Sequence, residues 1–159
     1  MLLLNFPRGA EEVRSFRDVA ELKRAARGLV IAPHPFFPAP HCLLGRMPQH
    51  AGLFDAVEYN AMYTASVNFN IPAERWARRH GVPMVGNGDV HRLEQLGTTY
   101  SLVDAACDPA SICEAIAAGR VRVVSRPLPW PTAARIFASL VVPPFGRPGR
   151  PPEPARAAV

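Results

Sequence analysis

The sequence lacks the patterns that identify several common classes of protein. Its three cysteines, Cys42, Cys107 and Cys113, form no C-x-x-C pair, which argues against a disulfide framework and a zinc knuckle. No apolar run approaches the length of a membrane-spanning helix. The apolar start at residues 1–4 is too short for a secretion signal and has no cationic segment before it. We therefore expect a cytoplasmic protein that does not enter a membrane.

Basic residues are in excess, but they do not gather into a nucleic-acid-binding pattern. The formal net charge is +5, and part of it lies near the C-terminus, where Arg147, Arg150 and Arg156 are opposed only by Glu153. No run of basic residues is interleaved with aromatic residues, so the charge does not indicate nucleic acid as a partner. It is compatible with a preference for anionic substrates.

Apolar runs of strand length alternate with helix signals along most of the chain. Predicted strands cover residues 2–6, 29–32, 54–60, 82–85, 98–103 and 121–124. Helices are predicted after Ser15, where Asp18 completes a capping box, near Asn70, and after Asp108. This order predicts an α/β fold with a largely parallel sheet. The unbroken aliphatic run 29–32 is typical of a parallel strand covered on both faces.

At 159 residues, with 48% hydrophobic residues, the chain has the size and composition of one domain. We expect one folded unit over residues 1–125. Residues 126–142 form an extension with a predicted helix over 132–142. Residues 143–159, rich in proline and arginine, are predicted to be a disordered tail.

Polar side chains follow the apolar runs at the points where strands are predicted to end. Gly86 and Gly88 allow a sharp turn after residues 82–85, and in extended chain Asp89 and His91 would point the same way. A carboxylate and an imidazole placed in this way suit a metal ion. Taken alone, the pair could equally belong to an ordinary surface loop.

Two further residues at strand ends strengthen the metal interpretation. His34 lies between Pro33 and Pro35, which hold the backbone extended and stiff, directly after the strand at 29–32. Glu58 lies near the end of the strand at 54–60. Because the carboxyl ends of parallel strands build the site in α/β sheets and barrels, these side chains are expected to meet at one rim.

Four segments together resemble a known superfamily. Residues 32–35, 54–58, 86–91 and 96–100 resemble the C-terminal half of the PHP (polymerase and histidinol phosphatase) superfamily. Its members are distorted β/α barrels that hold two or three metal ions, and many of them hydrolyse phosphoesters. The resemblance covers roughly residues 1–125 and implies an incomplete distorted β/α barrel.

The resemblance also assigns roles to individual residues. His34, Asp89 and His91 match metal ligands of the superfamily. Glu58 and Asn87 match positions that act as weak ligands or hold a ligand in place, and Asn87 stands where serine is frequent. The implied cofactors are divalent ions, Zn, Mn or Fe. The implied substrate is a phosphorylated small molecule or a nucleotide.

One motif of the superfamily is missing. Its first strand is followed by an H-x-H pair, and further His and Glu ligands precede the His-Pro, but this sequence contains no H-x-H. The three retained ligands would be shared among different ions, whereas a catalytic zinc normally has three protein ligands. The implied metal site is therefore incomplete, or absent, in this chain.

Three interpretations follow from that incomplete ligand set. The chain is a truncated metal-dependent phosphoesterase that needs a missing N-terminal half or a partner chain, or it is a non-catalytic remnant that acts as a structural module. A third, weaker interpretation is a small-anion binding module that uses the glycine turn at 86–88. A missing half barrel would leave open sheet edges, so a homo-oligomer or a complex with a partner is predicted.

Overall fold

The computed structural model describes residues 1–7 and 10–141, and the predicted tail over residues 143–159 lies outside the described residues. The strands are β1 (Leu2–Leu4), β2 (Leu29–Ala32), β3 (Ala56–Asn60), β4 (Met84–Asn87), β5 (Thr99–Val103) and β6 (Val121–Ser125). The α-helices are α1 (Phe16–Ala25), α2 (Asn70–His80), α3 (Pro109–Ala117) and α4 (Trp130–Val141). Short 3-10 helices at Leu44–Arg46 and Pro48–Leu53 lie in the connection between β2 and β3.

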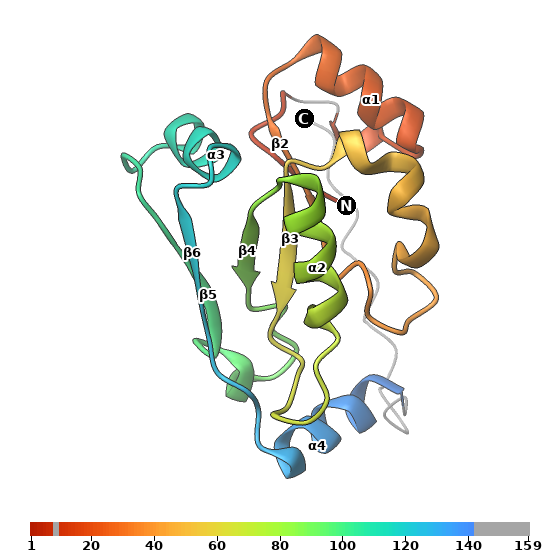
Figure 1. The fold of residues 1–159 in the computed structure, drawn as a ribbon, viewed down its shortest axis with the longest axis vertical. Helices are drawn as coiled ribbons and strands as arrows, with labels where there is room; N and C mark the ends of the chain where they lie inside the picture. Colours follow the sequence, from red (N-terminus) through yellow and green to blue (C-terminus); the bar gives the residue numbers. More distant parts are fainter. Residues whose placement is uncertain (8–9, 142–159) are drawn as a thin grey trace, which may run out of the picture.

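A mixed sheet forms the centre of the molecule. Its four strands lie in the order β1-β2-β3-β4, with β2, β3 and β4 parallel and β1 antiparallel at the edge. The α/β class and the mostly parallel sheet are thereby confirmed, whereas a closed or partial barrel is not shown. In Figure 1, β3 and β4 run toward the end of the molecule where α4 lies.

The last two strands differ from the prediction, because they do not extend the parallel sheet. β5 and β6 form a separate antiparallel pair. The reason lies at Ser101 of β5, whose hydroxyl accepts from the backbone N–H of Gly86 at 2.8 Å and donates to the Gly86 carbonyl at 3.1 Å. The Ser101 side chain thus forms hydrogen bonds with the N–H and C=O of Gly86 in β4, which another strand would otherwise pair. β5 lies beside the main sheet without joining its ladder.

Local signals account for the boundaries of the helices. The predicted capping box is present, since Asp18 N donates to Ser15 Oγ at 3.2 Å and Ser15 N donates to the Asp18 carboxylate at 2.8 Å. In α2, Pro72 lies in the first turn, and Gly81 ends the helix with φ 67°, a left-handed conformation that glycine adopts without steric cost. No helix in the described part of the chain is long and apolar enough to cross a membrane.

Both faces of the sheet are covered, as the apolar run of β2 predicts. On one face, Val30 and Val57 pack with residues of α1, α2 and the 3-10 segment before β3. On the other face, Leu29 and Val85 pack with Ile116 of α3. A third, small cluster holds α4 through Ile136. The sheet is therefore fixed on both sides, and its strand ends form a stable base for a site.

Replacing Gly86 by alanine is expected to destabilise the fold by about 1–3 kcal/mol. A Cβ atom at this position would lie 2.6 Å from the backbone oxygen of Tyr100, so β4 and β5 would have to move apart. Urea denaturation followed by circular dichroism measures the change. Gly52→Ala is the control, since nothing lies within 4 Å of its added Cβ. Equal stability of the two variants would contradict the close approach of β5 to β4.

Candidate metal centre

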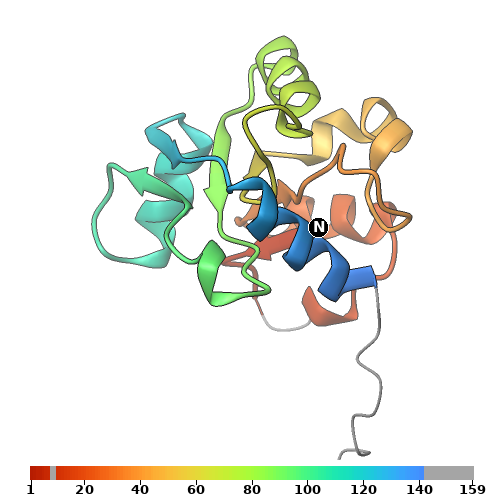
Figure 2. The same ribbon diagram turned by 90° about the horizontal axis from the view of Figure 1, so that it is seen from below.

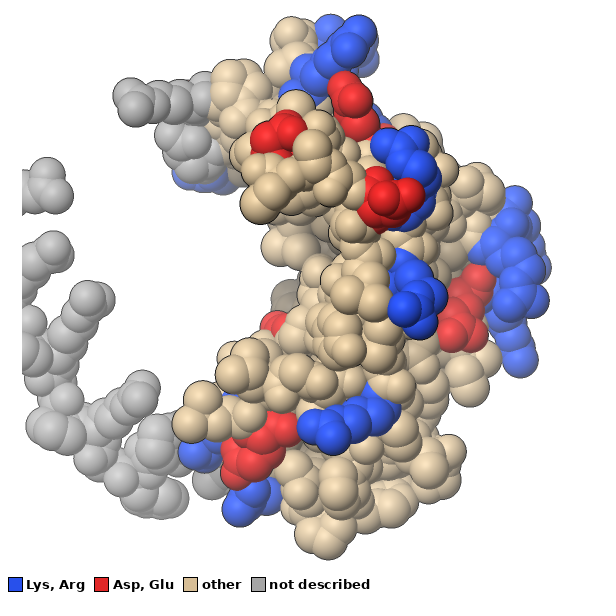
Figure 3. All heavy atoms as spheres, turned by 90° about the vertical axis from the view of Figure 1, so that its left-hand side faces the viewer, with Lys and Arg blue, Asp and Glu red and all other residues tan. Residues whose placement is uncertain are grey.

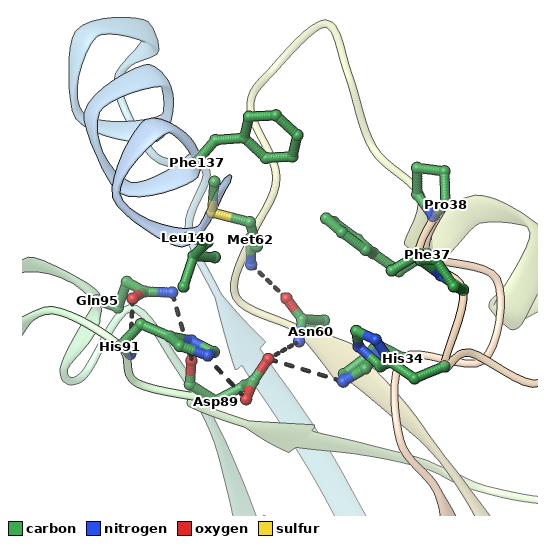
Figure 4. Close-up of a pocket in the computed structure, with 13 residues that line it drawn as sticks. His34, Phe37, Pro38, Asn60, Met62, Asp89, His91, Gln95, Phe137 and Leu140 are labelled. Carbon is green, nitrogen blue, oxygen red and sulfur yellow. Dashed lines mark hydrogen bonds and ion pairs between the residues drawn. The ribbon is translucent and has the colours of Figure 1, made fainter. Parts of the chain in front are cut away.

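The ends of the three parallel strands bring the predicted site residues to one rim. His34 follows β2, Glu58 lies within β3, and Asp89 and His91 follow β4. A cleft of about 580 Å³ opens there, and its polar lining consists of His34, His41, Asn60, Asp89, His91 and Gln95. α4 borders the cleft (Figure 4) and crosses this end of the molecule in the view from below (Figure 2).

His34 occupies a constrained position. Its φ is 24°, a left-handed value that is unfavourable for a residue with a side chain. Its ring Nε2 lies 3.8 Å from Asp89 Oδ2, and its Nδ1 lies 3.2 Å from the Cys42 sulfur. Burial lowers the pKa of His34 and outweighs the opposing effect of the Asp89 charge, so the neutral ring is favoured. A neutral imidazole is the form that binds a metal.

Glu58 holds the backbone of His34 in place. Its carboxylate accepts a hydrogen bond from the His34 N–H, and the residue is only 2% exposed. The pKa of Glu58 is raised to about 7, mainly because the carboxyl group is buried, and the nearby Asp89 charge raises it as well. The hydrogen bonds from the His34 backbone and from the Asn87 and Asn60 side chains act in the opposite direction and lower the pKa. Glu58 therefore lies behind His34, and Asn87 lies beside Glu58. This arrangement agrees with a supporting role for both residues, which stays a prediction.

Asp89 and His91 come together for a different reason from the predicted one. The chain is not extended here, because Asp89 has φ 39°, and Gly86 lies inside β4 rather than at a turn. His91 Nδ1 lies 2.8 Å from the Asp89 carbonyl and 4.0 Å from its Oδ1. Since a carbonyl only accepts, Nδ1 carries the hydrogen, which leaves Nε2 of the neutral ring free.

Two of the four described non-glycine residues with positive φ, His34 and Asp89, lie within this site. Strained backbone of this kind persists only where surrounding contacts hold it, and it is concentrated at functional sites. Here the contacts are the Glu58 carboxylate at His34 and the Asn60 side chain at Asp89.

Three site residues were not singled out by the sequence pattern. Asn60 Nδ2 donates to Asp89 Oδ2 at 2.9 Å, and Asn60 lies at the end of β3, the same kind of position that identified Glu58. Buried Gln95 accepts from the backbone N–H of His91 at 2.9 Å and so shapes the loop after β4. Cys42 contacts the His34 ring. No sequence signal distinguished Gln95.

The donors fit part of a metal site. Two ligands bound at about 2.1 Å to one tetrahedral ion lie about 3.4 Å apart, and His34 Nε2 and Asp89 Oδ2, at 3.8 Å, come close to that separation. The number of ligands does not fit a complete site, since the described residues hold no group of three or more His, Cys, Asp or Glu side chains arranged to bind an ion. An imidazole and a carboxylate are in place, and further ligands are needed.

The chain matches known proteins over part of its length. Residues 68–121 match a family model described as PHP-associated. A crystal structure of a two-domain protein from Bacteroides vulgatus ATCC 8482, containing a predicted PHP-like metal-dependent phosphoesterase, is similar with a TM-score of 0.51 at 17% identity. The match covers 79% of this chain and 40% of that chain. No curated protein matches the sequence. The match over residues 68–121 confirms the predicted resemblance to PHP proteins in that range, and the similar crystal structure shows a shared fold.

Proposed function

We propose that this chain supplies the C-terminal part of a PHP-like metal-dependent phosphoesterase. Residues 1–125 would form part of a distorted β/α barrel, residues 126–142 an extension with α4, and 143–159 a disordered tail. The predicted compartment is the cytoplasm. The observation that carries the proposal is the approach of the His34 imidazole to the Asp89 carboxylate across the ends of β2 and β4.

In this proposal His34 and Asp89 hold a divalent ion, Zn, Mn or Fe, and His91 presents its Nε2 to the same cleft. When bound, the ion would supply Lewis-acid polarisation and would neutralise the charge of the phosphate. Other side chains hold these two ligands in place. Glu58 fixes the backbone of His34, Cys42 contacts the His34 ring, and Asn60 fixes Asp89. The substrate is a phosphorylated small molecule or a nucleotide.

The ligand count implies that other groups complete the site. Because the described residues hold no group of three ligands, we propose that the remaining ligands come from an H-x-H-bearing segment, either in a longer form of the protein or in a partner chain. The incomplete ligand set is equally compatible with the alternative function, in which the chain is a non-catalytic structural module that has kept the fold. Metal binding separates these two functions.

The unaltered chain is expected to bind about one Mn²⁺ or Zn²⁺ ion weakly, because two side-chain ligands hold an ion less well than three. Isothermal titration measures the affinity, on material whose mass is determined by light scattering. His34→Ala is expected to lose the binding. His80→Ala is the matched control, since His80 stacks on Trp76 at the end of α2, away from the cleft.

Two outcomes decide between the functions. If the unaltered chain binds no ion, or if His34→Ala binds as well as His80→Ala, the metal proposal fails and the structural module is favoured. If the DNA upstream of Met1 encodes an in-frame H-x-H pair, the longer protein is expected to bind metal tightly and to hydrolyse p-nitrophenyl phosphate. A longer protein that is fully loaded with metal but inactive would contradict the phosphoesterase function.

A further inference from the structure

The cleft beside the candidate metal centre has an apolar side as well as a polar one. Phe37, Met62, Phe137 and Leu140 line the cleft together with Asp89 and His34 (Figure 4), and the Phe37 ring lies edge-on to the His34 ring, with 6.1 Å between the ring centroids. We call the four apolar residues the apolar wall. Phe37 comes from the loop after β2, Met62 from the loop after β3, and the other two from α4. Three separate segments therefore bring apolar side chains to one side of the site.

Two residues of the apolar wall are exposed, whereas Phe37 and Met62 are half-buried and Met62 packs against the small core cluster that includes Ile136. Phe137 is 49% exposed and Leu140 is 47% exposed, while α4 is anchored by other residues, including fully buried Ile136. Large apolar side chains grouped in a concave site beside a few polar groups are typical of a ligand-binding cleft. α4 thus uses one side for attachment and presents Phe137 and Leu140 to the cleft.

The charge of the cleft limits what can bind against this wall. Among the described residues that line it there is no Lys or Arg, so an anionic group finds no side-chain cation except at the histidines. A sugar or polyol placed against the wall would cover less apolar surface with apolar atoms than a ring-sized hydrocarbon group does, and so would gain less from burial. The lining suits an apolar group on one side, and a phosphate on the other side would need an ion at His34 and Asp89 to offset the carboxylate charge.

We propose that the apolar wall binds the organic part of the substrate and that this part is an apolar, ring-sized group, so that the preferred substrate is an aryl-type phosphate ester. This inference rests on the proposed phosphoesterase function and deepens it. The wall would select the alcohol portion of the ester, and the phosphate end would lie toward His34 and Asp89, the residues that would hold an ion.

A second cavity lies next to the cleft and has an apolar lining. A groove of about 410 Å³ shares Phe37, Pro38, Met62 and Phe137 with the cleft and continues along α4 toward Trp130. Trp130 is 55% exposed, and its indole N–H donates to Ser66 at 3.0 Å. Because the two cavities share these side chains, they lie next to each other along the same apolar surface. A fused two-ring group, which covers more of that surface than a single ring does, is the probe we choose.

The test compares 2-naphthyl phosphate with glycerol phosphate, by naphthyl fluorescence and by isothermal titration, first in EDTA and then with Mn²⁺. We expect 2-naphthyl phosphate to bind about tenfold more tightly than glycerol phosphate in both conditions, since burial of the rings does not require the ion. Phe137→Ser and Leu140→Ser are each expected to remove most of this preference. Leu102→Ser is the matched control, because Leu102 is 45% exposed on β5 and lies outside the cleft.

Circular dichroism of each variant confirms that it is folded. Equal affinity for the two esters, or an unchanged preference in both Phe137→Ser and Leu140→Ser, overturns the inference about the apolar wall. The proposed function fails in a different way. If Mn²⁺ does not tighten the binding of either ester, the metal-dependent role of the site is contradicted, while a naphthyl preference that depends on Phe137 still supports the wall.

Discussion

Replacing Asp89 by alanine is expected to abolish measurable binding of Mn²⁺ or Zn²⁺ and, in any complete form of the enzyme, phosphatase activity. Among the described carboxylates, that of Asp89 lies within 4.0 Å of a ring nitrogen of both His34 and His91. Without it, the two imidazoles have no shared partner. The loss should exceed the roughly 10–100-fold that follows removal of a group that merely supports a ligand.

Two controls separate the charge of Asp89 from its place in the loop. Asp89→Asn keeps an oxygen that can accept from Asn60 but removes the negative charge, so we expect a folded protein with greatly weakened metal binding. Asp104→Ala removes an exposed carboxylate outside the cleft and should bind metal as the unaltered chain does. Full activity or full metal binding in Asp89→Ala would remove this residue from the mechanism.

Glu58→Ala is expected to destabilise the protein by about 2–4 kcal/mol, because it leaves a buried N–H unsatisfied and opens a cavity. The His34 N–H donates to the Glu58 carboxylate, and Glu58 is buried beneath the site. The left-handed backbone at His34 would then lose the contact that holds it. Urea denaturation gives the change in free energy of unfolding, and metal titration shows whether His34 keeps its position.

Glu58→Gln is the matched variant, since its amide oxygen can still accept from His34 and its volume is similar. It should recover most of the stability and most of the metal binding. If Glu58→Ala proves as stable as Glu58→Gln, the hydrogen bond to His34 does not hold the backbone. If Glu58→Gln binds no metal at all, Glu58 acts as a ligand rather than as a support.

Features set by neighbouring residues were predictable from the sequence. The capping box of Ser15 and Asp18, the glycine that ends α2 and the buried run of β2 all follow from short-range rules, and the structure confirms them. The convergence of His34 with Asp89 was also predictable, because parallel strands place their carboxyl ends at one edge.

Features that depend on tertiary contacts were not predictable. The position of β5 beside β4, outside the ladder of the main sheet, involves the hydroxyl of Ser101 and the backbone of Gly86, and nothing in the run 98–103 indicates that contact. The left-handed backbone at Asp89 replaced the extended chain that was expected, although the side chains still met. Gln95 shapes the loop after β4 from four residues beyond His91, through a side chain that alternation rules do not consider.

Asn60 links the polar side of the cleft to Met62, one residue of the apolar wall. Its amide nitrogen holds Asp89, its amide oxygen accepts from the backbone N–H of Met62 at 2.6 Å, and its own backbone is paired with the Asn70 side chain at the start of α2. The Asp89 carboxylate, which would hold an ion, and the backbone of Met62, whose side chain would contact an organic group, are thus both bonded to the Asn60 side-chain amide. Folding has therefore already placed these two groups relative to each other, so less of the entropic penalty of ordering them remains to be met when a ligand binds.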